Sequence, residues 1–201
     1  MTRHPHLPAT RRAIAALALA ACAAVAAVPA AAAPAPELPR LESQLLVRPA
    51  DDDLATRLAN AYRSSGEVER GIRFFERFHA ANPPSPMSLV WQGSLKAMLS
   101  ASGDDMEARL NWLQSGIADM DRAVRTFPDR MDVRAVRGIT VSNFPAFLAM
   151  HGKAIRDLEA ALAAGDALTP GFRQAARDGL ARAYRQAGRE ADAKRVAESG
   201  R

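Results

Sequence analysis

Pro49 and Pro83 stand about 34 residues apart, a separation within the range of internal repeat periods. Gly66 divides the segment between them into two stretches. In each stretch apolar residues recur every three or four positions, which is the spacing of one face of an α-helix. Proline ends helices and glycine favours tight turns, so the segment predicts two antiparallel helices joined at Gly66. No part of the sequence alternates polar and apolar residues as a strand would, so we expect an all-α fold.

The residues inside this segment are patterned as well as spaced. A large apolar residue and a small one precede an aromatic in the first stretch, and a small residue precedes two aromatics in the second. The residues are Leu58-Ala59-x-x-Tyr62, then Gly71-x-x-x-Phe75 and Phe78. This pattern resembles the tetratricopeptide repeat, in which small residues let two helices cross closely and aromatic side chains fill the gap. The resemblance implies a hairpin array that binds proteins or peptides.

Three further copies follow, and the resemblance covers nearly all of the chain from Leu41 onward. The second copy is about eleven residues longer than a standard repeat, with the excess near Ala101 to Trp112. The third has a small insertion around Asn143-Phe144-Pro145. The copies carry Trp91, Gly93, Gly116-x-x-x-Met120 and Pro128; Val136, Gly138 and Ala154-x-x-x-Leu158; and Leu180-Ala181-x-x-Tyr184, Gly188 and Ala193-x-x-x-Ala197. We expect about four antiparallel hairpins, with insertions in the middle two.

The N-terminal segment has the composition of an export signal. Arg3, Arg11 and Arg12 precede an apolar run over residues 13–28, and small residues follow it. We therefore predict a signal peptide at 1–33, an Ala/Pro-rich linker at 34–40, and a helical domain at 41–201, with residues 38–47 adding one helix before the first repeat. Removing the signal lowers the net charge from +5 to +2, because three arginines are lost and no acid. This small charge gives no support to nucleic-acid binding.

Cys22, the single cysteine, leaves two locations open. The sequence Leu19-Ala20-Ala21-Cys22 resembles a bacterial lipobox, which implies lipidation of Cys22 and anchoring to a membrane. Cleavage near Ala33 would instead release a soluble periplasmic protein. Both alternatives place the protein outside the cytoplasm, and apart from these two segments nothing in the sequence predicts contact with a membrane.

Residues suited to catalysis or metal binding are sparse after the signal. His79 and His151 lie in no metal-binding spacing, and neither a glycine-rich phosphate loop nor a nucleophile elbow is present. Asp51, Asp52 and Asp53 precede a predicted helix, where carboxylates cap free backbone amides. We therefore predict helix capping at these acids, no metal, no cofactor and no enzymatic activity.

The predicted binding surface is the concave face, which the first helix of each repeat lines in tetratricopeptide arrays. Basic and amide side chains suit the carboxylates of a bound peptide. The predicted groove residues are Arg57, Asn60 and Arg63 in the first copy, Arg134, Arg137 and Asn143 in the third, and Arg182 and Arg185 in the fourth. These residues predict an adaptor or scaffold in the periplasm or cell envelope, with a protein or peptide as its partner.

Two alternative functions follow from other features. Lipidation of Cys22 would make the protein a structural component of an envelope or secretion complex. The insertions would alternatively form a pocket for a small ligand or an enzymatic site, with Trp112, Asn143 and His151 as its candidate residues.

Overall fold

The structure is a computed structural model that describes residues 37–199. Within this range the chain forms nine α-helices and two short 3-10 helices, with no strand. The elements are α2 (Glu37–Val47), α3 (Asp52–Ser65), α4 (Val68–Ala81), α5 (Pro86–Leu99), α6 (Met106–Thr126), α7 (Met131–Ser142), η2 (Ala146–Leu148), α8 (His151–Ala163), η3 (Gly165–Ala167), α9 (Pro170–Gln186) and α10 (Glu190–Glu198).

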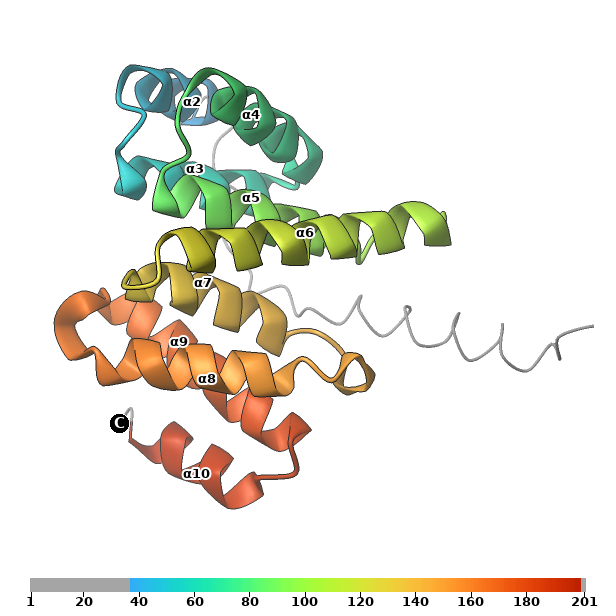
Figure 1. The fold of residues 1–201 in the computed structure, drawn as a ribbon, viewed down its shortest axis with the longest axis vertical. Coiled ribbons are helices and arrows are strands. Elements are labelled where there is room, and N and C mark those ends of the chain that lie inside the picture. The colour runs from blue at the N-terminus through green and yellow to red at the C-terminus, as the bar shows by residue number, and fades with distance from the viewer. Residues whose placement is uncertain (1–36, 200–201) are drawn as a thin grey trace, which may run out of the picture.

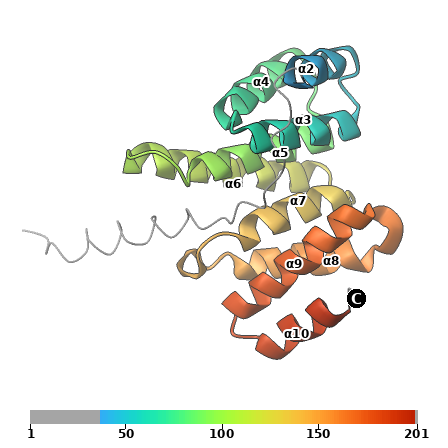
Figure 2. The same ribbon diagram turned by 180° about the vertical axis from the view of Figure 1, so that it is seen from behind.

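Four helical hairpins stack from one end of the molecule to the other, and α2 packs against the first of them (Figure 1). The first helices of the hairpins are α3, α5, α7 and α9, which we call the A helices; α4, α6, α8 and α10 are the B helices. Each A helix contacts the next A helix in the series. The B helices α6 and α8 lie in front in Figure 1, and Figure 2 views the opposite face. The predicted all-α hairpin array is confirmed.

Helix boundaries follow local side-chain chemistry. Asp51 caps α3, because its carboxylate accepts a hydrogen bond from the backbone amide of Leu54 at 2.9 Å. Gly66 ends the same helix with φ of 77°, a conformation that costs glycine little. Ser85 caps α5 by accepting from the amide of Ser88. The capping role predicted for the acidic run is confirmed at Asp51.

Small residues stand where paired helices cross, as the repeat pattern predicts. A Cβ atom on Gly93 of α5 would lie 2.7 Å from the backbone oxygen of Gly116 in α6, closer than such atoms approach. The backbones of α5 and α6 are therefore in direct contact. Tyr62, Phe75 and Phe78 are buried in the first hairpin, where they fill the space between its helices.

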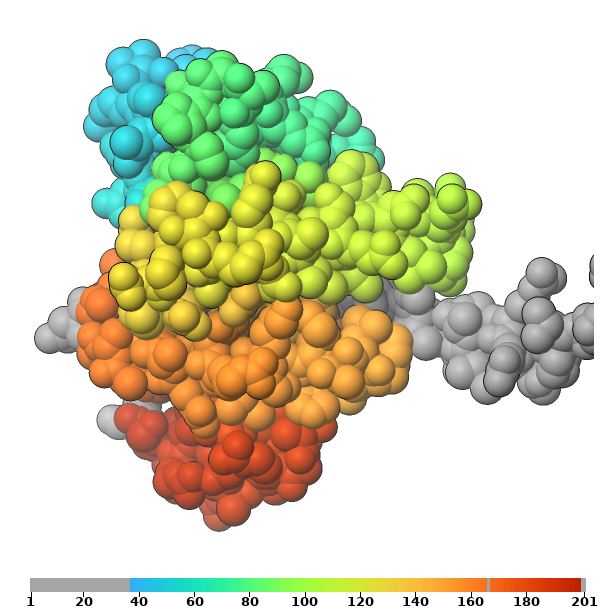
Figure 3. All heavy atoms as spheres, in the orientation of Figure 1, coloured from blue at the N-terminus to red at the C-terminus, as the bar shows by residue number. Residues whose placement is uncertain are grey.

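The two middle hairpins differ from the regular ones in distinct ways. The excess of the second repeat lengthens α6 to 21 residues, and its N-terminal end projects past the neighbouring helices (Figure 3). Trp112 on this extension is half-buried and packs against the core, so it holds the extension to the array. The excess of the third repeat forms the connection between α7 and α8, which contains η2 and the exposed side chain of Phe147.

The helix predicted over residues 38–47 is present as α2, which begins at Glu37. Residues 37–40, assigned also to the end of the linker, are therefore part of this helix. Glu37 stabilises the start of α2, because its negative charge lies at the positive end of the helix dipole. Pro39 is tolerated in the first turn because the backbone nitrogens there have no intrahelical partner. The signal peptide, Cys22 and residues 34–36 of the linker lie outside the described residues. Among the helices between Glu37 and Ser199, none is long and apolar enough to cross a membrane.

Candidate functional site

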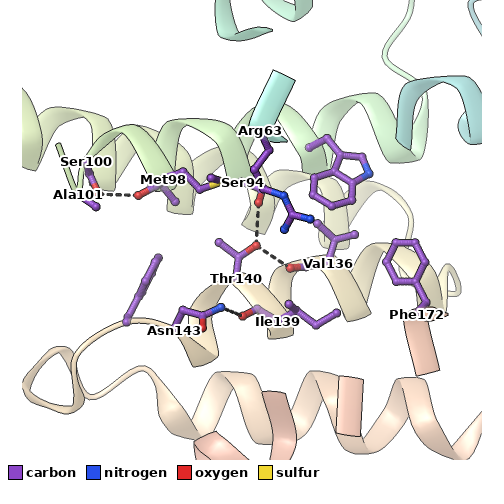
Figure 4. A pocket seen from close by; sticks show the side chains of 13 residues that line it. Arg63, Ser94, Met98, Ser100, Ala101, Val136, Ile139, Thr140, Asn143 and Phe172 are labelled. Atoms are coloured by element: carbon purple, nitrogen blue, oxygen red, sulfur yellow. Dashed lines mark hydrogen bonds between the residues drawn. The ribbon is translucent and has the colours of Figure 1, made fainter. Parts of the chain in front are cut away.

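A pocket of about 100 Å³ lies across the A helices of all four hairpins. It is lined by Arg63 from α3, by Trp91, Ser94, Ala97 and Met98 from α5, by Val136, Ile139, Thr140 and Asn143 from α7 and its end, and by Phe172 from α9. Figure 4 shows these side chains converging between the ribbons of α5 and α7. We call this site the A-face pocket.

The floor of the A-face pocket is apolar because its hydroxyl groups bond to one another or to the backbone. Ser94 and Thr140 share a hydrogen bond of 2.8 Å that joins α5 to α7. Thr140 also donates to the carbonyl of Val136 at 2.8 Å. The side-chain amide of Asn143 donates to the carbonyl of Ile139. The floor therefore presents few polar groups to an occupant, and its chemistry suits an apolar side chain.

Trp91 separates the A-face pocket from a second hollow on the same face. Its indole nitrogen donates to Thr56 on α3 at 3.2 Å, and its ring lies 6.5 Å from the ring of Phe172. Phe172 lines both pockets, and the second hollow, of about 460 Å³, also contains Asp53 and Arg57. The two hollows adjoin at Phe172. Together they form one groove on the A face, with the rings of Trp91 and Phe172 between its two parts.

The three residues predicted on α3 all lie along this groove. Arg57 lines the second hollow and Arg63 the A-face pocket. Asn60 is half-buried and stands between them on the same helix face, by its spacing from Thr56 and Arg63. Arg63 points its guanidinium between α5 and α7 (Figure 4) and makes no ion pair with any residue of the described range. Arg63 is exposed, but desolvation of its guanidinium lowers its pKa.

Arg134 and Arg137 are predicted in the groove, but they point to the B helices. Arg137 donates two hydrogen bonds of 2.7 Å to Asp157 of α8 and one of 2.9 Å to Asp121 of α6. Arg134 lies 3.5 Å from Asp157. Asp157 is only 1% exposed, and a buried carboxylate requires paired cations. These two arginines therefore stabilise the packing of α6, α7 and α8, and neither lines the A-face pocket.

Asn143 lines the A-face pocket, whereas Arg182 on α9 lines neither hollow. Gly179 packs against α7 and Gln186 donates to a carbonyl at the end of α7, so Arg182, spaced between them, lies along the same seam. The Nε atom of Arg182 is buried without a hydrogen-bond partner, and burial lowers the pKa of this side chain. Arg185 is exposed and lines neither hollow.

A polar network that the sequence did not predict lies on the other side of α5. His79 of α4 contacts Gln92 at 2.6 Å through Nδ1 and Ser88 at 2.9 Å through Nε2. Gln92 and the buried Lys96 both donate to Asp119 of α6. Burial lowers the pKa of His79. The network joins three helices beneath the groove, and its groups are bonded to one another.

The remaining candidate residues do not gather into one pocket. Asn143 lines the A-face pocket, but Trp112 and His151 do not. His151 is the first residue of α8, and its Nδ1 atom is buried without a partner. Between residues 37 and 199 no group of three or more histidine, cysteine or acidic side chains could hold a metal ion.

Comparisons with known proteins address the fold. No protein-family model matches the sequence, and no curated protein matches it significantly. A solved structure of a thermophilic tetratricopeptide repeat protein from Thermus thermophilus is similar, with a TM-score of 0.62 over 81% of this chain and 79% of the other. The two sequences are 23% identical over that match. The hairpin geometry and this similarity show that the chain has the tetratricopeptide repeat fold.

Proposed function

We propose that this protein is a non-catalytic adaptor that binds an extended segment of another protein along its A face. The observation that carries the proposal is the groove itself. It crosses all four A helices, its floor is apolar, and Arg63, which lines it, forms no ion pair with a residue of the range 37–199. Tetratricopeptide arrays generally mediate protein interactions, which agrees with such a surface.

The shape of the site favours a chain over a small molecule. The pocket is open along the array and continues past Trp91 into the second hollow, so an occupant can extend over several hairpins. An extended peptide bound in this way would place alternate side chains toward the groove. The polar groups of the floor are already bonded to one another, which leaves no arrangement of a nucleophile and a base.

Site-specific photo-cross-linking tests this function. A photoreactive residue replaces Ala101, which lines the A-face pocket, and in a second variant it replaces Ala191, which is exposed on α10. In the native cell envelope we expect a discrete protein adduct from position 101 and none from position 191. Equal labelling at both positions, or no adduct at position 101, contradicts binding in the groove.

The proposed location is the periplasm or cell envelope, following export directed by residues 1–33. Mass spectrometry of the mature N-terminus distinguishes the two forms. A lipid-modified Cys22 supports an envelope-anchored scaffold, and an unmodified start near Ala33 supports a soluble adaptor. A chain that retains Met1 in the cytoplasm would overturn the proposed location, but it would leave the groove function standing.

A further inference from the structure

The polar network around His79 closes the junction between the first hairpin and the second. His79 lies on α4, and both of its ring nitrogens contact side chains of α5. Gln92 extends the connection to Asp119 of α6, whose carboxylate also accepts a hydrogen bond from Lys96 at 2.9 Å. Lys96 in turn pairs with Glu76 of α4 at 3.1 Å. The network therefore ties α4 to the pair of helices α5 and α6 through one histidine and one lysine.

The hydrogen bonds of this network determine which nitrogen of His79 gains a proton. The side-chain amide of Gln92 donates to the carboxylate of Asp119 at 3.0 Å, so the amide oxygen faces His79. An amide oxygen accepts and does not donate, and Nδ1 must therefore carry the hydrogen in the contact of 2.6 Å. Nε2 is then the nitrogen that titrates, and its partner is the hydroxyl of Ser88 at 2.9 Å.

Ser88 satisfies Nε2 in either protonation state. When His79 is neutral, the hydroxyl of Ser88 donates to Nε2. When Nε2 is protonated, it donates to Ser88, and the hydroxyl then donates to the carbonyl of Ser85, which lies 3.0 Å away. Protonation therefore leaves both ring nitrogens with a partner, and its consequence is electrostatic.

The charges around the imidazole decide what its protonation does to the packing. The charged groups around it are Glu76 of α4, Lys96 of α5, and Asp119 and Arg122 of α6. Two acids and two bases balance one another, so a proton on His79 adds a positive charge without a counter-ion. Burial lowers the pKa of His79, and the positive charges of Arg122 and Lys96 act in the same direction. The imidazolium is more stable where water reaches it, so protonation favours an arrangement in which α4 lies farther from α5.

The groove lies on the other side of the same junction, and both α3 and α4 contact α5 (Figure 1). Every residue of α5 from Met87 to Ala97 is buried, so this helix has no free face that could absorb a displacement. Its Gly93 touches the backbone of α6, which makes the two helices one unit. On the groove side, the indole of Trp91 joins the first hairpin to that unit by donating to Thr56 of α3 at 3.2 Å. A displacement of the first hairpin at His79 therefore changes the contact between Trp91 and Thr56, and with it the groove.

We propose that His79 is a proton-dependent switch for the groove, in which protonation of Nε2 loosens the first hairpin from the second and weakens the binding of a partner on the A face. This inference rests on the proposed function and names the regulation of that site. A partner bound across α3 and α5 would hold the two hairpins together, and by linkage it would oppose the protonation of His79. The switch acts below about pH 6.5 and above the range in which ordinary carboxylates titrate.

Tryptophan fluorescence tests the switch without a partner. The chain has two tryptophans, so Trp112→Phe leaves Trp91 as the single reporter. We expect the emission of Trp91 to change reversibly between about pH 7.5 and pH 5, with a one-proton midpoint below about 6.5. His79→Gln should remove this step, because glutamine donates and accepts hydrogen bonds but does not titrate. His151→Gln is the matched control, since His151 is the other histidine of the described range, and it should keep the step.

Circular dichroism over the same pH range distinguishes the switch from unfolding. The helical signal should stay constant while the emission of Trp91 changes. A step that persists in His79→Gln, an emission that does not change with pH, or a step that coincides with loss of the helical signal each overturns the switch.

Photo-cross-linking from position 101 in isolated envelopes at two pH values separates this inference from the proposed function. The yield of the adduct should be about threefold or more lower at about pH 5.5 than at about pH 7.5, and His79→Gln should reduce this difference. Equal yields at both pH values overturn the regulation while groove binding stands. If position 101 gives no adduct at either pH, the proposed function fails, and the emission of Trp91 still decides whether the two hairpins respond to His79.

Discussion

Asp157 is the residue whose replacement most directly tests the roles assigned to the arginines of α7. Its carboxylate is 1% exposed and accepts two hydrogen bonds of 2.7 Å from Arg137. Asp157→Asn preserves the shape of the side chain but removes its charge and turns one acceptor into a donor. The guanidinium of Arg137 then loses its closest counter-ion and faces an amide that repels it.

The expected cost follows from what Arg137 keeps. Removing one member of a buried ion pair costs about 3–5 kcal/mol, because the other charge stays buried without compensation. Arg137 retains Asp121 at 2.9 Å, and that carboxylate is a quarter exposed. We therefore expect the lower value, about 3 kcal/mol of unfolding free energy. For a chain of this size that loss lowers the melting temperature by about 6–12 °C.

Urea and thermal unfolding followed by circular dichroism measure both quantities. Glu69→Gln is the control, because Glu69 pairs with Arg73 on the surface of α4 and both side chains are more than half exposed. Such a pair contributes about 0.5 kcal/mol or less. A loss in Asp157→Asn as small as that of the control would refute the buried ion pair. Loss of peptide binding by this variant, with stability unchanged, would indicate that Arg137 acts in the groove and does not stabilise the packing of α7 and α8.

Three further predictions concern packing and protonation. Gly93→Ala should lower the unfolding free energy in urea by about 3 kcal/mol, because the new Cβ meets backbone in α6; Gly171→Ala, with open space around it, should leave it nearly unchanged. The lowered pKa of His79 means that the unfolded chain binds a proton near pH 6.5 that the folded chain does not. Stability should therefore fall as pH drops below about 6.5, and the slope between pH 5.5 and 7 should be smaller in His79→Gln, whereas an unchanged slope would contradict the assignment. Burial and a hydrogen bond to Glu159 raise the pKa of Tyr184 to about 12. An absorbance titration should show this step, Tyr184→Phe should remove it, and a step near pH 10 in the folded protein would contradict it.

The hairpins could be predicted because their signals are local. A turn glycine such as Gly66, a cap such as Asp51 and a small residue such as Gly93 each act within one helix or between neighbouring helices. The repeat period, about 34 residues, then brings the same chemistry back at regular intervals. All of these features can be recognised in the sequence alone, and the structure contains them.

The positions of the insertions could be predicted from the sequence, but the structures that they form could not. The excess residues of the second repeat continue α6, because no helix-breaking residue stands between Met106 and Thr126 except Gly116, which the crossing requires. The excess of the third repeat holds Pro145, which cannot continue α7 and begins a short loop. Both outcomes depend on where the breakers fall within the insertion, not on its length.

The side toward which each predicted arginine points could not be predicted from helical spacing. Arg134 and Arg137 are separated by the same spacing as Arg182 and Arg185, so each pair has the same periodicity. What separates the two pairs is a carboxylate on the B helix that follows in the chain. Asp157 is within reach of the first pair. No carboxylate of the described chain forms an ion pair with the second.

Aligning the four repeats by their small residues shows where that carboxylate comes from. The position just before the small residue of each A helix is apolar in the first and fourth repeats and polar in the middle two: Leu58, Gln92, Arg137 and Leu180. The position three after the small residue of each B helix follows the same division: Phe74, Asp119, Asp157 and Val196.

In the middle repeats these two positions bond to each other, Gln92 to Asp119 and Arg137 to Asp157. In the middle hairpins, polar side chains therefore bond the A helix to the B helix. A regular repeat has apolar contacts at these positions. Their groove-facing surface is left to apolar and hydroxyl residues. In the outer hairpins the same interface is apolar, with Leu58 and Phe74 in the first and Leu180 and Val196 in the fourth. The apolar floor of the A-face pocket between α5 and α7 is therefore a consequence of how the middle repeats differ inside.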